Sequence, residues 1–135
     1  MAGGSASRSA SSSPPPKRPV ALLIGDGSFL YNPVIQGLGA SPDQSLPLLI
    51  VGFNNRKYRA RQENHTEYYP DGVAASSGIF YGTHINGPDY SELGRPFDFG
   101  GRRVSAASEL RDVICDAMKD VAGGKTSILN IELSR

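Results

Sequence analysis

The sequence contains little cysteine, no tryptophan, no long apolar run and no block of basic residues. Its single cysteine, Cys115, excludes a disulfide or a cysteine-based zinc cluster within this chain. No apolar run reaches the roughly 18–20 residues of a membrane-spanning helix, so we expect no membrane partner. The 14 basic and 13 acidic residues leave a net charge of +1, which argues against nucleic acid as the main partner.

Residues 1–19 differ in composition from the rest of the chain. They are mostly serine, proline, alanine and glycine, and Met1 is their only large apolar side chain. Such a stretch cannot bury enough surface to offset the entropy that ordering would cost. We therefore predict a disordered tail over residues 1–19 and one folded domain over residues 20–135.

The same tail bears on where the protein is located. It is basic, rich in serine and free of acidic residues, as mitochondrial transit peptides are. However, Pro14–Pro16 and Pro19 prevent the amphipathic helix that a transit peptide forms, and the tail lacks the apolar segment of a secretory signal. We expect a cytoplasmic protein, with a mitochondrial location as the alternative.

Two apolar runs predict strands in the first half of the domain. Val20–Ile24 is continuously apolar, which is typical of a strand buried on both faces, and Gly25-Asp26-Gly27 ends it. Leu46–Phe53 is a second such run and ends at Asn54-Asn55. Between them, Asn32-Pro33 is a helix-start signal. Two strands joined by a helical segment form a βαβ unit, which implies parallel pairing.

The second half of the domain predicts a helix and a further strand. Ser105 can cap the helix, Gly123-Gly124 can end it, and residues 126–133 follow as a strand. Residues 56–89 have little periodicity and read as a long, partly ordered excursion. The fold class is therefore α/β, with a mostly parallel sheet of at least three strands flanked by helices. The helix is predicted from one apolar stripe, formed by Leu110, Val113, Ile114, Ala117, Met118 and Val121.

Polar side chains follow both apolar runs, at the edge of the sheet where parallel strands bring their carboxyl ends together. Asp26 offers an anionic oxygen and Asn55 a neutral amide oxygen. Both suit Mg²⁺, which proteins commonly hold through one or two oxygens together with substrate phosphates. Gly25 and Gly27 allow close approach of a phosphate to the backbone, and the following helix would direct N–H groups at it. The pattern predicts a site for magnesium and phosphate.

Each half of this pattern also has a purely structural interpretation. Asp-Gly and Asn-Asn are both common turn sequences after a strand. It is the occurrence of both, at matching strand ends, that favours a binding site over two unrelated turns.

The chain resembles the thiamine diphosphate enzymes, and most closely their decarboxylase and acetolactate synthase-like branch, which includes benzoylformate decarboxylase and benzaldehyde lyase. The core of the resemblance is Gly25-Asp26-Gly27-Ser28 followed by Asn54-Asn55, which is similar to the diphosphate-binding motif of that family. The resemblance covers almost all of residues 19–135. Its downstream matches are Gly87-Pro88-Asp89-Tyr90, Leu93, Phe99-Gly100-Gly101, Val104, Glu109-Leu110 and Ile128-Leu129-Asn130-Ile131-Glu132.

The resemblance implies a cofactor, thiamine diphosphate, and a metal ion, Mg²⁺. It implies that the side chains of Asp26 and Asn55 and the backbone carbonyl of Lys57 ligate the metal. The residues that it places at the diphosphate are Gly25, Gly27 and Ser28. Family members often have glycine directly after the paired asparagines, where this chain has Arg56.

The resemblance also implies what this sequence lacks. In the family, a glutamate that activates the aminopyrimidine ring lies in a separate N-terminal domain, to which nothing here corresponds. The resemblance therefore indicates a C-terminal cofactor domain that is truncated at its N-terminal side. Glu63, Glu67 and Glu92 lie downstream of the motif and none can take that role. His65 is a candidate for a substrate-side group, with solvent exposure as the default.

Two functional hypotheses follow from the sequence. The first is a module that binds thiamine diphosphate and Mg²⁺ in a 2-oxo acid decarboxylase or carboligase; whether the chain alone is an enzyme stays open. Its partners would be the cofactor, a polypeptide that carries the absent domains, and further copies in a homo- or hetero-oligomer. The alternative is a catalytically inert fragment, or an interaction module derived from such an enzyme.

Overall fold

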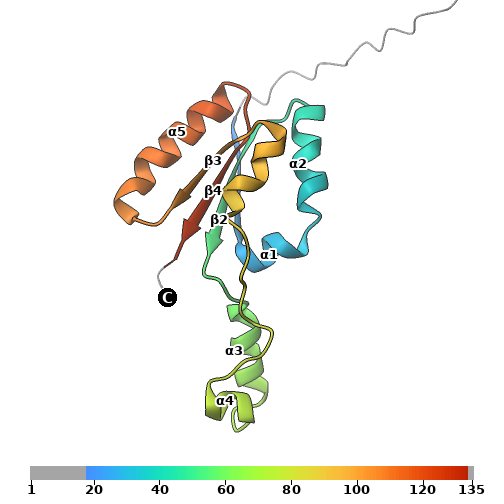
Figure 1. Cartoon of the computed structure of the whole chain (residues 1–135), viewed down its shortest axis with the longest axis vertical. Coiled ribbons are helices and arrows are strands. Elements are labelled where there is room, and N and C mark those ends of the chain that lie inside the picture. Colours follow the sequence, from blue (N-terminus) through green and yellow to red (C-terminus); the bar gives the residue numbers. More distant parts are fainter. Residues whose placement is uncertain (1–17, 134–135) are drawn as a thin grey trace, which may run out of the picture.

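A computed structural model describes residues 18–133 and shows a four-stranded sheet in which every strand is parallel to its neighbours (Figure 1). The spatial order is β1-β2-β4-β3. The predicted disorder of the tail falls almost wholly on residues 1–17, outside the described residues. The strands are β1 (Val20–Gly25), β2 (Leu48–Asn54), β3 (Gly100–Val104) and β4 (Ser127–Glu132).

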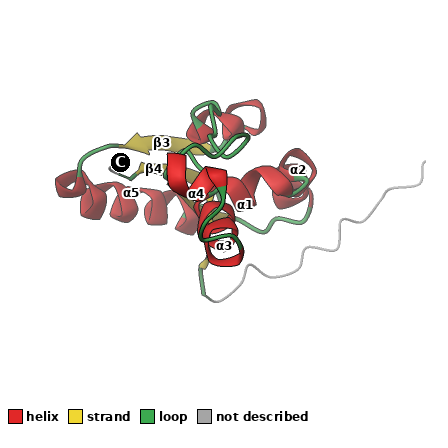
Figure 2. Cartoon of the chain, turned by 90° about the horizontal axis from the view of Figure 1, so that it is seen from below, coloured by secondary structure: helices red, strands yellow, loops and turns green. Residues whose placement is uncertain are grey.

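Helices cover both faces of this sheet (Figure 2). On one face, α5 (Leu110–Ala122) packs its apolar stripe against alternate residues of β2 and β4, such as Leu49 and Leu129. On the other face lie α1 (Asp26–Tyr31), α2 (Val34–Asp43) and the 3₁₀ helix η1 (Tyr90–Phe97). The predicted α/β class and parallel pairing are confirmed. None of the helices over residues 18–133 has the length and apolar character needed to cross a membrane.

The prediction that the first strand is buried on both faces is wrong. β1 forms an edge of the sheet and pairs only with β2. The side chains of Val20 and Leu23 are 54% and 65% exposed. A continuous apolar run gives burial only where neighbours cover it, and among the described residues no strand pairs with the outer edge of β1.

The strand β3 is absent from the sequence prediction. Its sequence, Gly-Gly-Arg-Arg-Val, has neither the alternation nor the apolar run of a strand. Its glycines serve packing instead, because a Cβ on Gly101 would strike the carbonyl oxygen of Ser91 in η1. Close approach of η1 to β3 therefore requires glycine at this position.

The prediction for α5 holds in its body and fails at its start. The helix ends at Ala122, as predicted directly before Gly123-Gly124, and Gly124 has φ of 88°. A 3₁₀ turn over Ala107–Glu109 precedes it, and no side chain caps its first turn, so the proposed cap by Ser105 is wrong. Cys115 lies beside the apolar stripe and is exposed.

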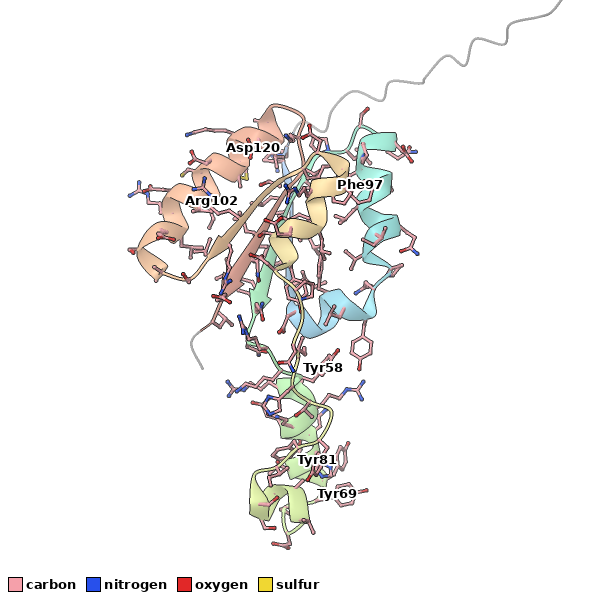
Figure 3. All side chains as sticks on the ribbon, in the orientation of Figure 1. Tyr58, Tyr69, Tyr81, Phe97, Arg102 and Asp120 are labelled. Carbon is pink, nitrogen blue, oxygen red and sulfur yellow. The ribbon has the colours of Figure 1, made fainter. Side chains whose placement is uncertain are left out.

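An arm projects from the carboxyl end of the sheet (Figure 1). It consists of α3 (Arg59–Tyr68), α4 (Val73–Ser77) and the segment that returns to η1. Neither helix has a buried residue, and Tyr81 near the far end is 91% exposed (Figure 3). The predicted excursion is thus a helical arm. The sequence analysis did not predict α3, because this helix has no apolar stripe.

Candidate functional site

The predicted site residues gather in one pocket of about 260 Å³ at the carboxyl ends of β1 and β2. In the register of these strands Gly25 lies opposite Phe53, so the residues that follow each strand emerge side by side. The arm forms the remaining wall. The lining residues are Gly25, Asp26, Gly27, Ser28, Tyr31, Asn55, Lys57, Tyr58, Arg59, Ala60 and Arg61.

Asp26 is the buried acid of this pocket. It is the first residue of α1 and only 4% exposed. The N–H of Gly27 donates to its Oδ1 at 2.9 Å, and the N–H of Arg56 donates to its Oδ2 at 2.8 Å. Within the described part of the chain, Asp26 forms no ion pair. A buried carboxylate that only neutral donors hold has unshared lone pairs and an unbalanced charge, which a bound cation would compensate.

The two asparagines after β2 have different surroundings. Asn54 is 6% exposed, donates from Nδ2 to Oδ1 of Asn130 at 3.2 Å, and accepts from the Arg56 N–H at 3.1 Å. Asn55 lines the pocket, and its Oδ1 accepts one hydrogen bond, from the Lys57 N–H at 3.0 Å. An amide oxygen can accept two hydrogen bonds or one hydrogen bond and a metal ion. The second asparagine is thus the one placed to ligate.

The backbone between these asparagines and the arm is held firmly. Arg56 has φ of 57°, a left-handed conformation that favours glycine. Its carbonyl accepts from the Ile85 N–H at 2.8 Å, and Lys57 pairs with His84 in an antiparallel bridge. The Arg56 side chain turns away from the pocket to Glu132 at 2.7 Å. The path of this loop is therefore fixed on both sides of Lys57.

The two glycines of the motif play different parts. A Cβ on Gly25 would meet no atom within 4 Å, so this position leaves open space beside the pocket. A Cβ on Gly27 would lie 2.7 Å from the ring of Tyr58, which covers it. Gly25 thus provides room for a ligand, and Gly27 provides room for the tyrosine. Ser28 is exposed in the first turn of α1.

Cationic and aromatic side chains of the pocket were missed by sequence reasoning. Arg59 pairs with Glu63 at 2.6 Å. Arg61 donates to the hydroxyl of Tyr31 at 3.3 Å and lies 5.7 Å from the centre of its ring. Four of residues 56–61 are basic, which the expectation of no basic block overlooked. This local cluster was the available signal, because basic side chains attract a polyanionic ligand.

A buried tyrosine, Tyr90, lies near Asp26 and is uncharged. The Tyr90 hydroxyl has no hydrogen-bond partner within residues 18–133, and its ring meets that of Phe29 edge-on at 5.6 Å. Burial, followed by the nearby Asp26 carboxylate, raises the pKa of the Tyr90 phenol. The phenol therefore stays neutral, and Asp26 is the single acidic side chain in the pocket wall.

The donor set fits a hard cation and an anion together. No three His, Cys, Asp or Glu side chains gather anywhere in residues 18–133, which leaves a carboxylate, an amide oxygen and backbone carbonyls as ligands. Oxygen ligands of this kind suit Mg²⁺ and not zinc. The open space at Gly25 and the cations of the arm suit a phosphate group that would complete the coordination.

The other polar candidates lie elsewhere. His65 belongs to a separate pocket of about 550 Å³ within the arm, where its ring lies 5.4 Å from that of Tyr69 and 5.9 Å from that of Phe80. His84 is exposed. Neither imidazole lines the pocket at Asp26.

Comparison with known proteins gives the family. The family described as "Thiamine pyrophosphate enzyme, C-terminal TPP binding domain" matches residues 2–131. Among solved structures, the benzoylformate decarboxylase of Polynucleobacter necessarius superposes with a TM-score of 0.65 at 24% identity. The thiamine diphosphate-dependent 4-hydroxybenzoylformate decarboxylase of Rhodococcus jostii RHA1 gives 0.58, also at 24% identity. Both alignments cover 87% of this chain.

Each alignment covers only 20% of the decarboxylase chain, so this chain spans about a fifth of the length of these proteins. The shared part is the parallel sheet with its flanking helices, and its carboxyl edge carries the pocket. The family match extends over nearly the whole sequence and agrees with the motif in that pocket. The chain belongs to the C-terminal TPP-binding domain family of the thiamine pyrophosphate enzymes.

Proposed function

We propose that the pocket at β1 and β2 binds the diphosphate of thiamine diphosphate through a Mg²⁺ ion. Asp26 and Asn55 would ligate the metal with side-chain oxygens, and Lys57 with its backbone carbonyl. Gly25, Gly27 and Ser28 would adjoin the diphosphate. The observation that carries the proposal is the convergence of Asp26 and Asn55 in one pocket, with Asp26 buried and unpaired by any cation of the described chain.

The basic wall of the pocket supports the same proposal. Arg59 and Arg61 come from the first turn of α3 and line the pocket with Lys57. A diphosphate bound by one divalent cation retains negative charge, which these side chains can attract. When bound, thiamine diphosphate would supply a nucleophilic carbon for chemistry at a carbonyl group, and the protein would supply position and electrostatics.

Calorimetric titration tests this proposal. Thiamine diphosphate would be titrated into the full chain with and without Mg²⁺, and we expect binding that requires the metal. Asp26→Asn keeps the shape and removes the charge, so its affinity should fall at least tenfold, equivalent to about 1.4 kcal/mol. Asp43→Asn is the matched control, since Asp43 is exposed at the end of α2. Equal affinity in all three proteins would reject the site.

We further propose that these 135 residues alone do not suffice for catalysis. The chain spans a fifth of the two decarboxylases, and the described residues place no glutamate in the pocket wall. Loss of an acid–base group typically costs about 10²–10⁴ in rate, and loss of positioning costs more. The purified chain should not decarboxylate benzoylformate or pyruvate. Turnover that Asp26→Asn abolishes would contradict this.

A second candidate function is that of an inert interaction module. The exposed apolar edge of β1 favours it, since unpaired strand edges bind other chains. An apolar groove of about 490 Å³ adjoins this edge and is lined by Leu22, Ile24 and Phe29 among others. The module would be oligomeric and would not bind the cofactor. Size-exclusion chromatography together with the titration above separates the two candidates.

A further inference from the structure

A continuous line of hydrogen bonds runs beneath the pocket and joins three parts of the fold. The Arg56 N–H donates to Oδ2 of Asp26 at 2.8 Å and to Oδ1 of Asn54 at 3.1 Å. Asn54 donates from Nδ2 to Asn130 at 3.2 Å, and Asn130 donates from Nδ2 to Asp89 at 2.9 Å. We call Asp89, Asn130 and Asn54 the relay. It links the start of η1 to the metal-binding loop through β4 and β2.

The relay has a fixed direction that begins at Asp89. An ionised carboxylate only accepts hydrogen bonds, so Asn130 must present its amide nitrogen to Asp89. The Asn130 oxygen then faces Asn54, whose nitrogen must donate, and the Asn54 oxygen is left for the Arg56 N–H. Since each amide orientation determines the next, the charge at Asp89 decides how the loop beside Asp26 is held.

Asp89 is itself held as a carboxylate. Oδ1 of Asp89 accepts from the Ser91 N–H at 3.0 Å and from the Ser91 hydroxyl at 2.6 Å, in addition to Asn130. Burial acts to raise the pKa of Asp89, but the hydrogen bonds from Ser91 and Asn130 outweigh it and leave the pKa lowered. The group at the origin of the relay is therefore ionised at neutral pH.

The relay ends at the strained point of the metal-binding loop. Arg56 is in a left-handed conformation, and its N–H is shared between Asn54 and Asp26. Asn130 is 1% exposed and Asn54 6% exposed, so water does not compete for these bonds. If the Arg56 amide shifted, Oδ2 of Asp26, to which it donates, would shift with it. The backbone from Asn55 to Lys57 would also move.

We propose that Asp89 and Asn130 are positioning residues for the metal site: the relay sets the Arg56 amide, which in turn orients the Asp26 carboxylate for the cation. The inference rests on the proposed function of the pocket. Neither residue lines the pocket, so both act only through Asn54 and Arg56.

Asn130→Asp tests the relay with a nearly isosteric change. The substitution replaces the amide nitrogen that donates to Asp89 by a carboxylate oxygen, which cannot donate. The two carboxylates then repel each other, and the sequence of hydrogen bonds from Asp89 to Asn54 is broken. We expect Mn²⁺ affinity in the presence of thiamine diphosphate, followed by electron paramagnetic resonance, to fall at least tenfold. The Arg56 amide signal should also shift in the ¹H–¹⁵N spectrum of the ligand-free protein, although residue 130 does not touch it.

Thr126→Val is the matched control. Thr126 is 2% exposed, directly precedes β4 at the end away from the pocket, and hydrogen-bonds Ser41 and the Leu48 N–H. Its loss therefore disturbs the sheet without touching the relay. We expect Mn²⁺ affinity within twofold of the wild type and an unchanged Arg56 signal. If the control weakens Mn²⁺ as much as Asn130→Asp does, general loss of sheet stability explains both and the proposal is overturned.

Asp89→Asn is a second test of the relay, for the case in which Asn130→Asp does not fold. Asp89→Asn keeps an oxygen for its three donors but loses the charge that fixes the direction of the relay; we expect a smaller affinity loss, severalfold, with the same shift of the Arg56 signal. A folded variant with wild-type Mn²⁺ affinity or an unmoved Arg56 signal overturns the relay. Absence of Mn²⁺ binding by the wild type overturns the proposed function of the pocket instead.

Discussion

The pocket at Asp26 and the pocket at His65 both include residues of the arm, and they differ in what holds their side chains. The pocket at Asp26 and Asn55 lies on the ends of two paired strands, with buried hydrogen bonds beneath it. The pocket at His65 is larger, but it is built on α3 and α4, which bury no residue. Chemically capable residues occur in both. Support by paired strands and buried hydrogen bonds, more than volume, therefore distinguishes the candidate binding site.

The largest effects are expected at the two asparagines of the pocket at Asp26, and they should differ between Asn54 and Asn55. Asn55→Ala should weaken Mg²⁺-dependent binding of thiamine diphosphate at least tenfold and leave the free energy of unfolding nearly unchanged. Asn54→Ala should lower the free energy of unfolding by about 1–3 kcal/mol, because buried partners lose their hydrogen bonds, and should also weaken binding by interrupting the relay. Calorimetric titration and urea unfolding measure the two quantities. The comparison breaks down if both variants show the same pattern.

Arg56→Gly probes the strain stored beside this pocket. A non-glycine residue in the left-handed conformation costs the folded chain about 1–2 kcal/mol, which glycine avoids. Glycine also makes the unfolded chain more flexible, and this offsets part of the gain in stability. We expect a gain of about 0.5–1 kcal/mol in unfolding free energy with unchanged metal affinity, since the N–H remains. Arg56→Ala keeps the strain and loses the ion pair with Glu132, so it should not stabilise. Stabilisation by both variants would show that the strain is not the cause.

Glu132 gives a smaller, pH-dependent effect at the same loop. Hydrogen bonds from Arg103, and then from Arg56, lower the pKa of its carboxyl group in the folded chain. A lowered folded pKa contributes stability above the ordinary value near 4.5, and this contribution is lost as the pH falls through the lowered pKa. Glu132→Gln should therefore cost a little stability at pH 7 and nothing in strong acid. A difference that stayed constant with pH would exclude the ion pairs as its source.

The smallest effect is expected in the arm. His65→Ala removes the imidazole from between Tyr69 and Phe80, and we expect thiamine diphosphate and Mg²⁺ affinities within twofold of the wild type. Titration of this variant beside Asn55→Ala sharpens the comparison of the two pockets. A tenfold loss in His65→Ala would show that the arm pocket takes part in cofactor binding.

The sequence was sufficient where apolar pattern and burial coincide. The stripe of α5, the runs of β2 and β4 and the polar residues at two strand ends all predicted features that the structure contains. The whole set of predicted site residues lines one pocket, because parallel pairing brings strand ends together whatever lies between them.

Sequence reasoning failed where tertiary contacts decide the structure. β3 exists because β4 offers a partner and η1 needs glycine beneath it, and neither fact is local to Gly100 or Gly101. The exposure of β1 depends on what lies beside it, which its own residues cannot reveal. The division of work between Asn54 and Asn55 depends on Asn130, which lies 76 residues from Asn54 in the sequence.

The most direct measurement is diffraction from crystals of the chain grown with thiamine diphosphate and Mn²⁺. We expect one strong anomalous peak in the pocket, in direct contact with side-chain oxygens of Asp26 and Asn55, with the diphosphate beside Gly25. A metal peak at any other place, or diphosphate bound in the pocket of His65, would contradict it.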